Sequence, residues 1–213
     1  MIPLCLDFSD RTVLVFGGGP VGARKARRFA SEAWTVVVSP TFADAAFGDA
    51  ELVRAAPAPD DVPEWVARAD PALVVTATDD AAVNDAAERA AREHGSLVNR
   101  ADAGVDARDL VVPATVADGP VAAAVATGGR APALSRHLKD ALADAIDGAG
   151  VVASVVAGVR DDLDHLDTDA RRETVRAVVA ADEVWTAARE EGTTEAVWEA
   201  VEGVLDDRGV ERR

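Results

Sequence analysis

The hydrophobic and polar positions of the first hundred residues alternate between short apolar runs and longer mixed segments. The apolar runs have the length of buried strands and lie at residues 11–16, 35–38, 51–54, 72–77 and 96–99. The segments 21–31 and 80–94 place alanine and other apolar residues at helical spacing. Because neighbouring parallel strands need a crossover, usually a helix, this alternation predicts an α/β fold with a Rossmann-type parallel sheet.

The pattern changes after about residue 104. Residues 110–113 and 120–126 are predicted to be two strands with no helix between them, and 133–146 a helix. From residue 151 onward the pattern is helical, with breaks at 167–169 and 192–194 that carry typical N-cap residues. We therefore predict a dinucleotide-binding domain at 1–113, a strand-containing connector at 114–148 and a helical C-terminal domain at 149–213. The proline-rich segment 57–63 is predicted to be a loop.

Composition and charge narrow the class of protein. The 213 residues are 49% hydrophobic and carry a formal net charge of −16, with lysine only at Lys25 and Lys139. The acids are spread along the chain, which favours a halophilic surface suited to high salt; the alternative is a role in binding basic partners. So acidic a field argues against nucleic acid as a partner.

The chain shows no membrane or export signal in its pattern. No apolar run reaches membrane-spanning length, and the first residues do not have the pattern of a signal peptide. The single Cys5 excludes an internal disulfide and a cysteine-based zinc site, and no histidine spacing indicates a preformed metal site. We expect a cytoplasmic protein with no membrane partner and no resident metal.

The first predicted strand runs directly into a glycine turn followed by a helix, which is the context a dinucleotide-binding turn requires. The turn comprises Gly17, Gly18, Gly19, Pro20, Val21 and Gly22. In this arrangement Gly17 permits the tight turn, Gly19 lets the backbone approach the phosphates and Gly22 lets helix and strand pack closely. The alternative is a turn that merely joins strand to helix. We predict that the turn holds the cofactor pyrophosphate at the helix N-terminus.

One element of the general dinucleotide fingerprint is missing. An acid usually ends the second strand and holds the adenosine ribose, but this chain has Ser39, Pro40 and Thr41 there. Pro40 and Thr41 are predicted to contact the cofactor, Thr41 through its hydroxyl or its backbone. No arginine stands in this segment to meet a 2′-phosphate, so the sequence favours NAD over NADP.

Six ordered motifs resemble the precorrin-2 dehydrogenase family, which includes the dehydrogenase–ferrochelatase part of siroheme synthase. They are 2–7 with the glycine turn and the Arg24-Lys25 pair, Val38-Ser39-Pro40, residues 77–84, residues 98–102, Pro113-Ala114 and residues 126–134. The chain departs from the family before Pro113, where a Cys-Asp-Phe stretch is frequent, and at Ala131, where serine is usual. These departures concern substrate contacts and metal insertion more than the dehydrogenase role.

The resemblance implies that precorrin-2 loses a hydride to NAD+ and a proton to a base, giving sirohydrochlorin. The family's important carboxylate falls on Asp102, which follows the fifth predicted strand; the alternative for Asp102 is a loop-capping role. Backbone near Thr78 is predicted to line the nicotinamide side, and Asp79 or Asp80 to cap the next helix. Asn84 is predicted to be a packing or capping residue.

The substrate's eight carboxylates require cationic and backbone contacts. The predicted substrate-binding residues are Arg100, Thr127, Gly128, Gly129 and Arg130. Arg108, Arg136 and Lys139 lie near the same motifs, and each of these cations has a surface ion pair as its alternative role. Arg24 and Lys25 are either solvated helix charges or contacts to cofactor or substrate. The four tryptophans are predicted to be packing residues.

Three points are left open by the sequence. In some family members the same site then inserts Fe2+, and nothing here decides whether this chain does so. The resemblance implies a homodimer formed through the connector, whose two strands are too few for a self-contained sheet. The competing functions are an NAD-binding regulatory module without catalysis, which does not explain Asp102, and a dehydrogenase acting on an unrelated small molecule.

Overall fold

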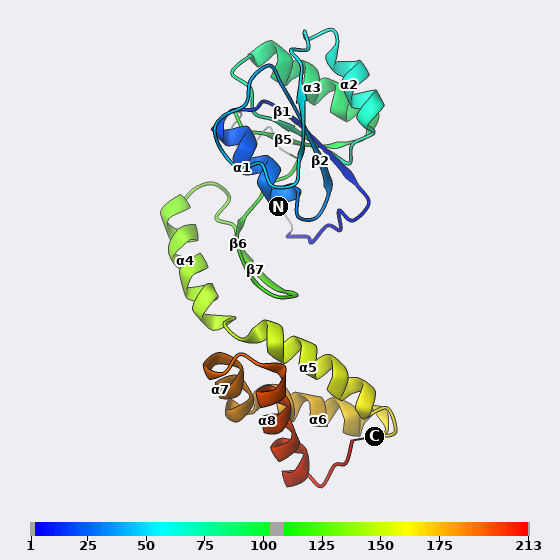
Figure 1. Cartoon of the computed structure of the whole chain (residues 1–213), viewed down its shortest axis with the longest axis vertical. Coiled ribbons are helices and arrows are strands. Elements are labelled where there is room, and N and C mark those ends of the chain that lie inside the picture. Colours follow the sequence, from blue (N-terminus) through cyan, green and yellow to red (C-terminus); the bar gives the residue numbers. More distant parts are fainter. Residues whose placement is uncertain (1–2, 103–108, 213) are drawn as a thin grey trace. The chain divides into compact units, whose positions relative to one another are not determined.

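The computed structural model describes residues 3–102 and 109–212 and divides into two compact units (Figure 1). The first unit covers residues 1–112 and the second residues 113–213. The predicted connector and the predicted helical domain both fall within the second unit. Arg108 lies outside the described residues.

The first unit is a five-stranded parallel sheet in the order β3-β2-β1-β4-β5. Its elements are β1 (Thr12–Phe16), α1 (Pro20–Phe29), β2 (Trp34–Ser39), β3 (Glu51–Arg54), α2 (Val62–Ala69), β4 (Leu73–Thr76), α3 (Ala81–His94) and β5 (Leu97–Arg100). The strand order reverses at β1, between β2 and β4, and ligands of open parallel sheets bind at such a switch point. The predicted Rossmann-type sheet is confirmed.

Helices cover both faces of this sheet, as the continuous apolar strands require. On one face α1 packs Ala23, Ala26 and Phe29 against residues of β1, β2 and β4. On the other face α2 and α3 cover Leu14, Phe16 and neighbouring strand residues. Most residues of the central strands are therefore buried, which holds the C-terminal ends of these strands, where the site lies, in fixed positions.

Three local predictions were wrong in the first unit. The segment 57–63 is not all loop, because α2 begins at Val62 with Pro63 in its first turn, where the missing N–H costs nothing. Residues 110–113 are not a strand; the backbone carbonyl of Leu110 instead accepts a bond from Asn99 Nδ2 (2.7 Å), and the next strand starts at Ala114. Trp34, expected to pack, is 68% exposed.

The second unit begins with an antiparallel hairpin and continues as helices. Its elements are β6 (Ala114–Asp118), β7 (Val121–Val125), α4 (Pro132–Ala145), α5 (Ala149–Asp162), α6 (Thr168–Ala180), α7 (Asp182–Glu190) and α8 (Thr194–Asp207). Asp167 and Thr193 cap α6 and α8 with their side chains, as predicted, whereas the break between α6 and α7 at Ala181 was not predicted. The helices α5 to α8 enclose a common apolar core.

Over the described residues, none of the individual helices is long and apolar enough to cross a membrane. The pair α4 and α5 passes the length and composition test only when taken together, and a 48° bend separates them.

Candidate dinucleotide groove and the Asp102 cluster

A groove of about 530 Å³ opens at the C-terminal ends of β1, β2 and β4. Eight of the nine predicted cofactor-binding residues line it: Gly17, Gly18, Gly19, Pro20, Val21, Pro40, Thr41 and Thr78. The ninth, Gly22, follows the lining residue Val21 in α1 and is buried. As contacts to a cofactor these residues stay predictions, but the structure brings them to one place.

Gly22 and Gly17 meet where β1 passes into α1. A Cβ added to Gly22 would overlap the carbonyl oxygen of Gly17, and Gly17 itself has a left-handed φ of +114° with Ala77 against it. No side chain fits at either position, so the two glycines let α1 start directly on top of the sheet. This geometry agrees with the packing role expected of Gly22.

Gly19 is the N-cap of α1 and behaves differently. Its backbone is extended, and a Cβ built there would meet no atom of the protein within 4 Å. The first turn of α1 carries neither an acid nor a side-chain cap, while Arg27 and Arg28 stand in the last turn. The helix therefore presents uncapped amide groups and the positive end of its dipole to the groove, which fits a pyrophosphate.

Beside the β2 end of the groove, a cation that the sequence pattern did not reveal contacts the lining residue Pro40. Arg54, the last residue of β3, donates from Nη1 to the backbone carbonyl of Pro40 (3.0 Å), and its guanidinium lies 5.5 Å from the ring centre of Phe42. No arginine lies near Pro40 along the chain, since Arg54 follows fourteen residues later. The parallel pairing of Ser39 with Arg54 brings it there.

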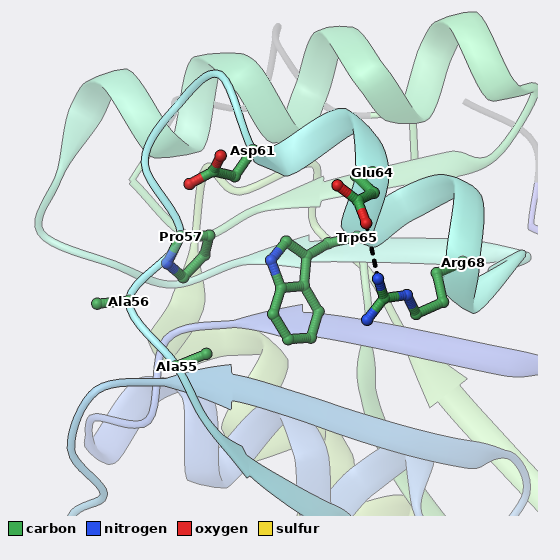
Figure 2. Close-up of a pocket in the computed structure, with 7 residues that line it drawn as sticks. All are labelled: Ala55, Ala56, Pro57, Asp61, Glu64, Trp65 and Arg68. Atoms are coloured by element: carbon green, nitrogen blue, oxygen red, sulfur yellow. Dashed lines mark hydrogen bonds and ion pairs between the residues drawn. The ribbon is translucent and has the colours of Figure 1, made fainter.

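A second, smaller pocket of about 310 Å³ adjoins the groove (Figure 2). Ala56 and Pro57 line both cavities, and the indole of Trp65 from α2 forms much of the remaining wall. Figure 2 shows Arg68 beside this indole, where it pairs with Glu64 (2.7 Å). The loop after β3, which carries Ala56 and Pro57, thus joins the smaller pocket to the groove.

On the other side of the glycine turn, hydrogen bonds link the groove wall to Asp102. The Thr78 hydroxyl lies 2.9 Å from Asn84 Oδ1, and Asn84 Nδ2 donates to the Thr78 carbonyl (3.0 Å) and to Asp102 Oδ2 (3.1 Å). Asn84 is 1% exposed, so the sequence was right to expect a packed residue but missed its bond to Asp102. Asp80 caps α3 through the amides of Ala82 and Val83, as predicted for Asp79 or Asp80.

Three carboxylates accept hydrogen bonds from the guanidinium of Arg100. It donates from Nε and Nη2 to the two oxygens of Asp102 (3.1 and 2.7 Å), and from Nη1 to Asp85 (2.6 Å) and Glu88 (2.7 Å). The forked contact with Arg100 is the main cause that lowers the pKa of Asp102, and the bond from Asn84 lowers it further. The carboxylates in turn raise the pKa of Arg100.

Of the pair after the glycine turn, Arg24 is exposed and Lys25 turns inward. Lys25 Nζ donates to Asn99 Oδ1 (2.7 Å), and Asn99 is buried in β5. Because Asn99 also binds the Leu110 carbonyl, Lys25 helps to fix the chain that leaves the first unit. Neither of the two expectations for Lys25 included this contact.

The predicted residues Thr127, Gly128, Gly129 and Arg130 lie in the second unit, in the turn before α4. Thr127 Oγ1 is 2.9 Å from Ser135 Oγ, and Gly128 and Gly129 have φ values of +61° and +75°. A Cβ at Gly128 would meet nothing within 4 Å. The turn is thus closed by its own hydrogen bonds and leaves its glycine backbone open.

Comparisons with known proteins agree with this geometry. The model of a family described as putative NAD(P)-binding matches residues 4–114. The siroheme synthase of Methylococcus capsulatus is 34% identical over 164 residues, which is 75% of this chain and 34% of that protein. The precorrin-2 dehydrogenase of Methanosarcina barkeri is 31% identical over 146 residues, which is 65% of this chain and 63% of that protein.

A solved structure described as "SirC, precorrin-2 dehydrogenase" shares the fold, with a TM-score of 0.69 and 24% identity over 97% of this chain and 100% of that one. The chain spans about a third of the length of the siroheme synthases it matches. These relatives confirm the resemblance to precorrin-2 dehydrogenases that the six motifs indicated. The chain belongs to the putative NAD(P)-binding family, the family whose model covers its glycine turn and its parallel sheet.

Proposed function

We propose that this chain is a precorrin-2 dehydrogenase that oxidises precorrin-2 to sirohydrochlorin with NAD+. The observation that carries the proposal is the link between the dinucleotide groove and Asp102: Asn84 bonds both to Thr78, which lines the groove, and to Asp102. A regulatory nucleotide-binding module would need the groove but not a carboxylate tied to its wall. The named relatives include siroheme synthases and a precorrin-2 dehydrogenase, which supports the same substrate.

The residues divide the work by their position. The uncapped start of α1 and Gly19 would hold the pyrophosphate of NAD+. Pro40 and Thr41, at the end of β2, would contact its adenosine half, and the backbone near Thr78, at the end of β4, its nicotinamide half. NAD+, when bound, supplies the hydride acceptor. Asp102 takes the proton that leaves the substrate. Thr127, Gly128, Gly129 and Arg130 bind the substrate's carboxylates through backbone and guanidinium groups.

The test supplies precorrin-2 with NAD+ or NADP+ and follows the tetrapyrrole spectrum in high salt. We expect turnover with NAD+ and weaker turnover with NADP+. Asp102→Asn keeps the side chain's size and removes the base, so turnover falls while NAD+ binding stays. Folded wild-type protein that binds NAD+ but forms no NADH would contradict the proposal and favour the regulatory module.

Iron insertion is the second candidate activity, and the relatives named siroheme synthase are the reason to test it. Over the described residues, no three His, Cys, Asp or Glu side chains form a ready ion site. Fe2+ enters this reaction as a substrate, with Asp102 as the group that accepts a displaced proton. Sirohydrochlorin mixed with Fe2+ at equal concentrations, with and without protein, measures whether insertion exceeds the spontaneous rate.

We further propose a homodimer in the cytoplasm, formed through β6, β7 and α4. No residue of the segment 113–148 is buried, and α4 exposes Leu134 and Leu138 at 48% and 38%. An apolar hairpin and helix left open in this way are suited to a second copy of the chain. The net charge of −16 leads us to expect a halophilic protein whose stability rises with salt, which urea unfolding at several salt concentrations will measure.

A further inference from the structure

Asp102 is held from two sides by residues that are themselves fixed. Asn84 approaches Oδ2 from α3 and is anchored to Thr78 through two contacts of its amide. Arg100 approaches both oxygens from β5, the strand that leads to Asp102. Because the two contacts come from different elements, the carboxylate has little freedom to turn even though its side chain is 33% exposed.

Arg100 has no unused donor nitrogen in this arrangement. All three side-chain nitrogens donate to carboxylates, and the side chain is only 11% exposed. A substrate carboxylate would have to displace Asp85, Glu88 or Asp102 to reach it. This makes Arg100 better suited to organising the protein's own acids than to gripping a ligand.

The charges around Asp102 support the same conclusion. The guanidinium of Arg100 contacts Asp85, Glu88 and Asp102 together. One step further out, Arg92 pairs with Glu88 (3.1 Å) and Asp109 (3.3 Å). Three carboxylates converging on one guanidinium would repel one another if that guanidinium were lost.

We propose that Asn84 and Arg100 are positioning residues for Asp102: Arg100 clamps both carboxylate oxygens, and Asn84 ties that carboxylate to the Thr78 wall of the nucleotide groove. The inference rests on the proposed function only where it assumes that Asp102 reacts. Independently of that function, Asn84 and Arg100 fix the position of the Asp102 carboxylate and keep it ionised.

The contacts of Asp102 shift its pKa in a definite direction. Arg100 and Asn84 lower the pKa of Asp102, whereas burial raises it. Asp102 therefore stays ionised down to pH values below its usual range, and the base form is lost only as pH falls through this lowered pKa. Removing Arg100 leaves the burial and the neighbouring acids, so the pKa of Asp102 rises and activity that needs the ionised form is lost at higher pH.

The experiment measures Asp102 directly as well as through turnover. Carboxyl carbons are observed by NMR through a pH titration, with Asp102 assigned from its absence in Asp102→Asn. We expect Arg100→Gln to raise the titration midpoint by about 1–3 pH units, and Arg100→Lys, which keeps the charge but not the fork, to raise it less. The acidic limb of the kcat profile should move by the same amount.

Asn84→Ala tests the second contact. We expect kcat to fall by up to about 100-fold because the carboxylate is no longer aimed, while the Kd for NAD+ stays within about threefold of wild type. Two controls match these changes. Arg92→Gln removes another arginine that pairs with Glu88. Ser96→Ala, at the opposite end of β5, removes the buried hydrogen bond from Ser96 to the carbonyl of Pro71. Both should leave the Asp102 titration and kcat unchanged.

The outcomes separate the two proposals. If the wild type binds NAD+ but does not turn over precorrin-2, the proposed function fails, and the NMR titration still decides whether Arg100 and Asn84 hold Asp102. An unchanged titration midpoint in Arg100→Gln and Arg100→Lys would overturn the clamp. A loss of kcat in Asn84→Ala no larger than in Ser96→Ala, at equal folded fraction, would reduce Asn84 to a structural residue.

Discussion

The first unit and the opening of the second unit differ in how they bury their apolar residues. In the first unit Val13, Leu14 and Val15 of β1 are fully buried, because helices cover both faces of the sheet. In the segment 113–148 no residue is buried, and α4 packs along the hairpin beside it. The remaining helices, α5 to α8, again enclose a core of their own.

The two kinds of burial suit different kinds of function. A sheet buried on both faces holds its strand ends rigidly, so the groove at β1, β2 and β4 and the Asp102 cluster at the end of β5 have little freedom. The hairpin and α4 have no core of their own, and we propose that a second copy of the chain covers their apolar side chains.

Gly22→Ala should do the most damage, since its new methyl group overlaps the Gly17 carbonyl at the tightest point of the first unit. We expect a loss of about 3 kcal/mol or more in unfolding free energy, together with loss of NAD+ binding. Urea unfolding measures the first and calorimetry the second. Gly203→Ala in α8 is the control: its Cβ meets nothing within 4 Å, so it should stabilise the protein by about 0.5–1 kcal/mol. Similar stability changes in both variants would contradict the packing argument.

Gly19→Ala separates the groove from the fold. The extended backbone of Gly19 accepts alanine, and the methyl group has free space on the protein side. Stability should stay unchanged or rise slightly, while NAD+ binding weakens by about 10- to 100-fold because the methyl group occupies space needed by the phosphates. Titration calorimetry with NAD+ checks the affinity. Unimpaired binding would show that the pyrophosphate does not approach Gly19.

Leu134→Glu combined with Leu138→Glu tests the open segment. Both side chains lie one helical turn apart on α4 and are exposed, so the folded unit should keep its stability while the dimer dissociation constant rises by about 10- to 100-fold. Sedimentation in high salt measures this constant. Val179→Glu on α6, at 40% exposure, is the matched control and should leave association unchanged. A wild-type monomer at micromolar concentration would refute the dimer itself.

Thr76→Val should have the smallest effect. The Thr76 hydroxyl is buried at the end of β4 and has no hydrogen-bond partner among the described residues. Valine has nearly the same shape, so removing the hydroxyl should be neutral or stabilise the protein by up to about 1 kcal/mol. Thr174→Val is the counterpart, because Thr174 Oγ1 donates to the Ala170 carbonyl (2.9 Å) and its loss should cost about 1 kcal/mol. Equal destabilisation by both would indicate a hidden partner for Thr76.

Periodicity predicted the fold well where the segment is long or strongly apolar. The strands 11–16 and 72–77 and the helix 80–94 were found within one or two residues of their observed bounds. Periodicity failed at α2, which is only eight residues long and follows prolines. It also failed at residues 110–113, where Leu110 and Val112 pack on the first unit but do not pair with a neighbouring strand. Short apolar stretches carry no period that distinguishes these cases.

The sequence by itself determined the parallel sheet and the glycine turn, because each depends on the order of residue types along a few neighbouring positions. The role of Asp102 stays a prediction that comes from the resemblance of its motif. Only the tertiary structure decided which side chains meet. Arg54 reaches Pro40 through strand pairing, and Asn84 reaches Asp102 across 18 residues of chain. Arg100, predicted from its charge to bind substrate, pairs in the structure with three acids from α3 and from the end of β5. Hydrogen bonds depend on distance in space, and local sequence does not encode that distance for residues in different elements.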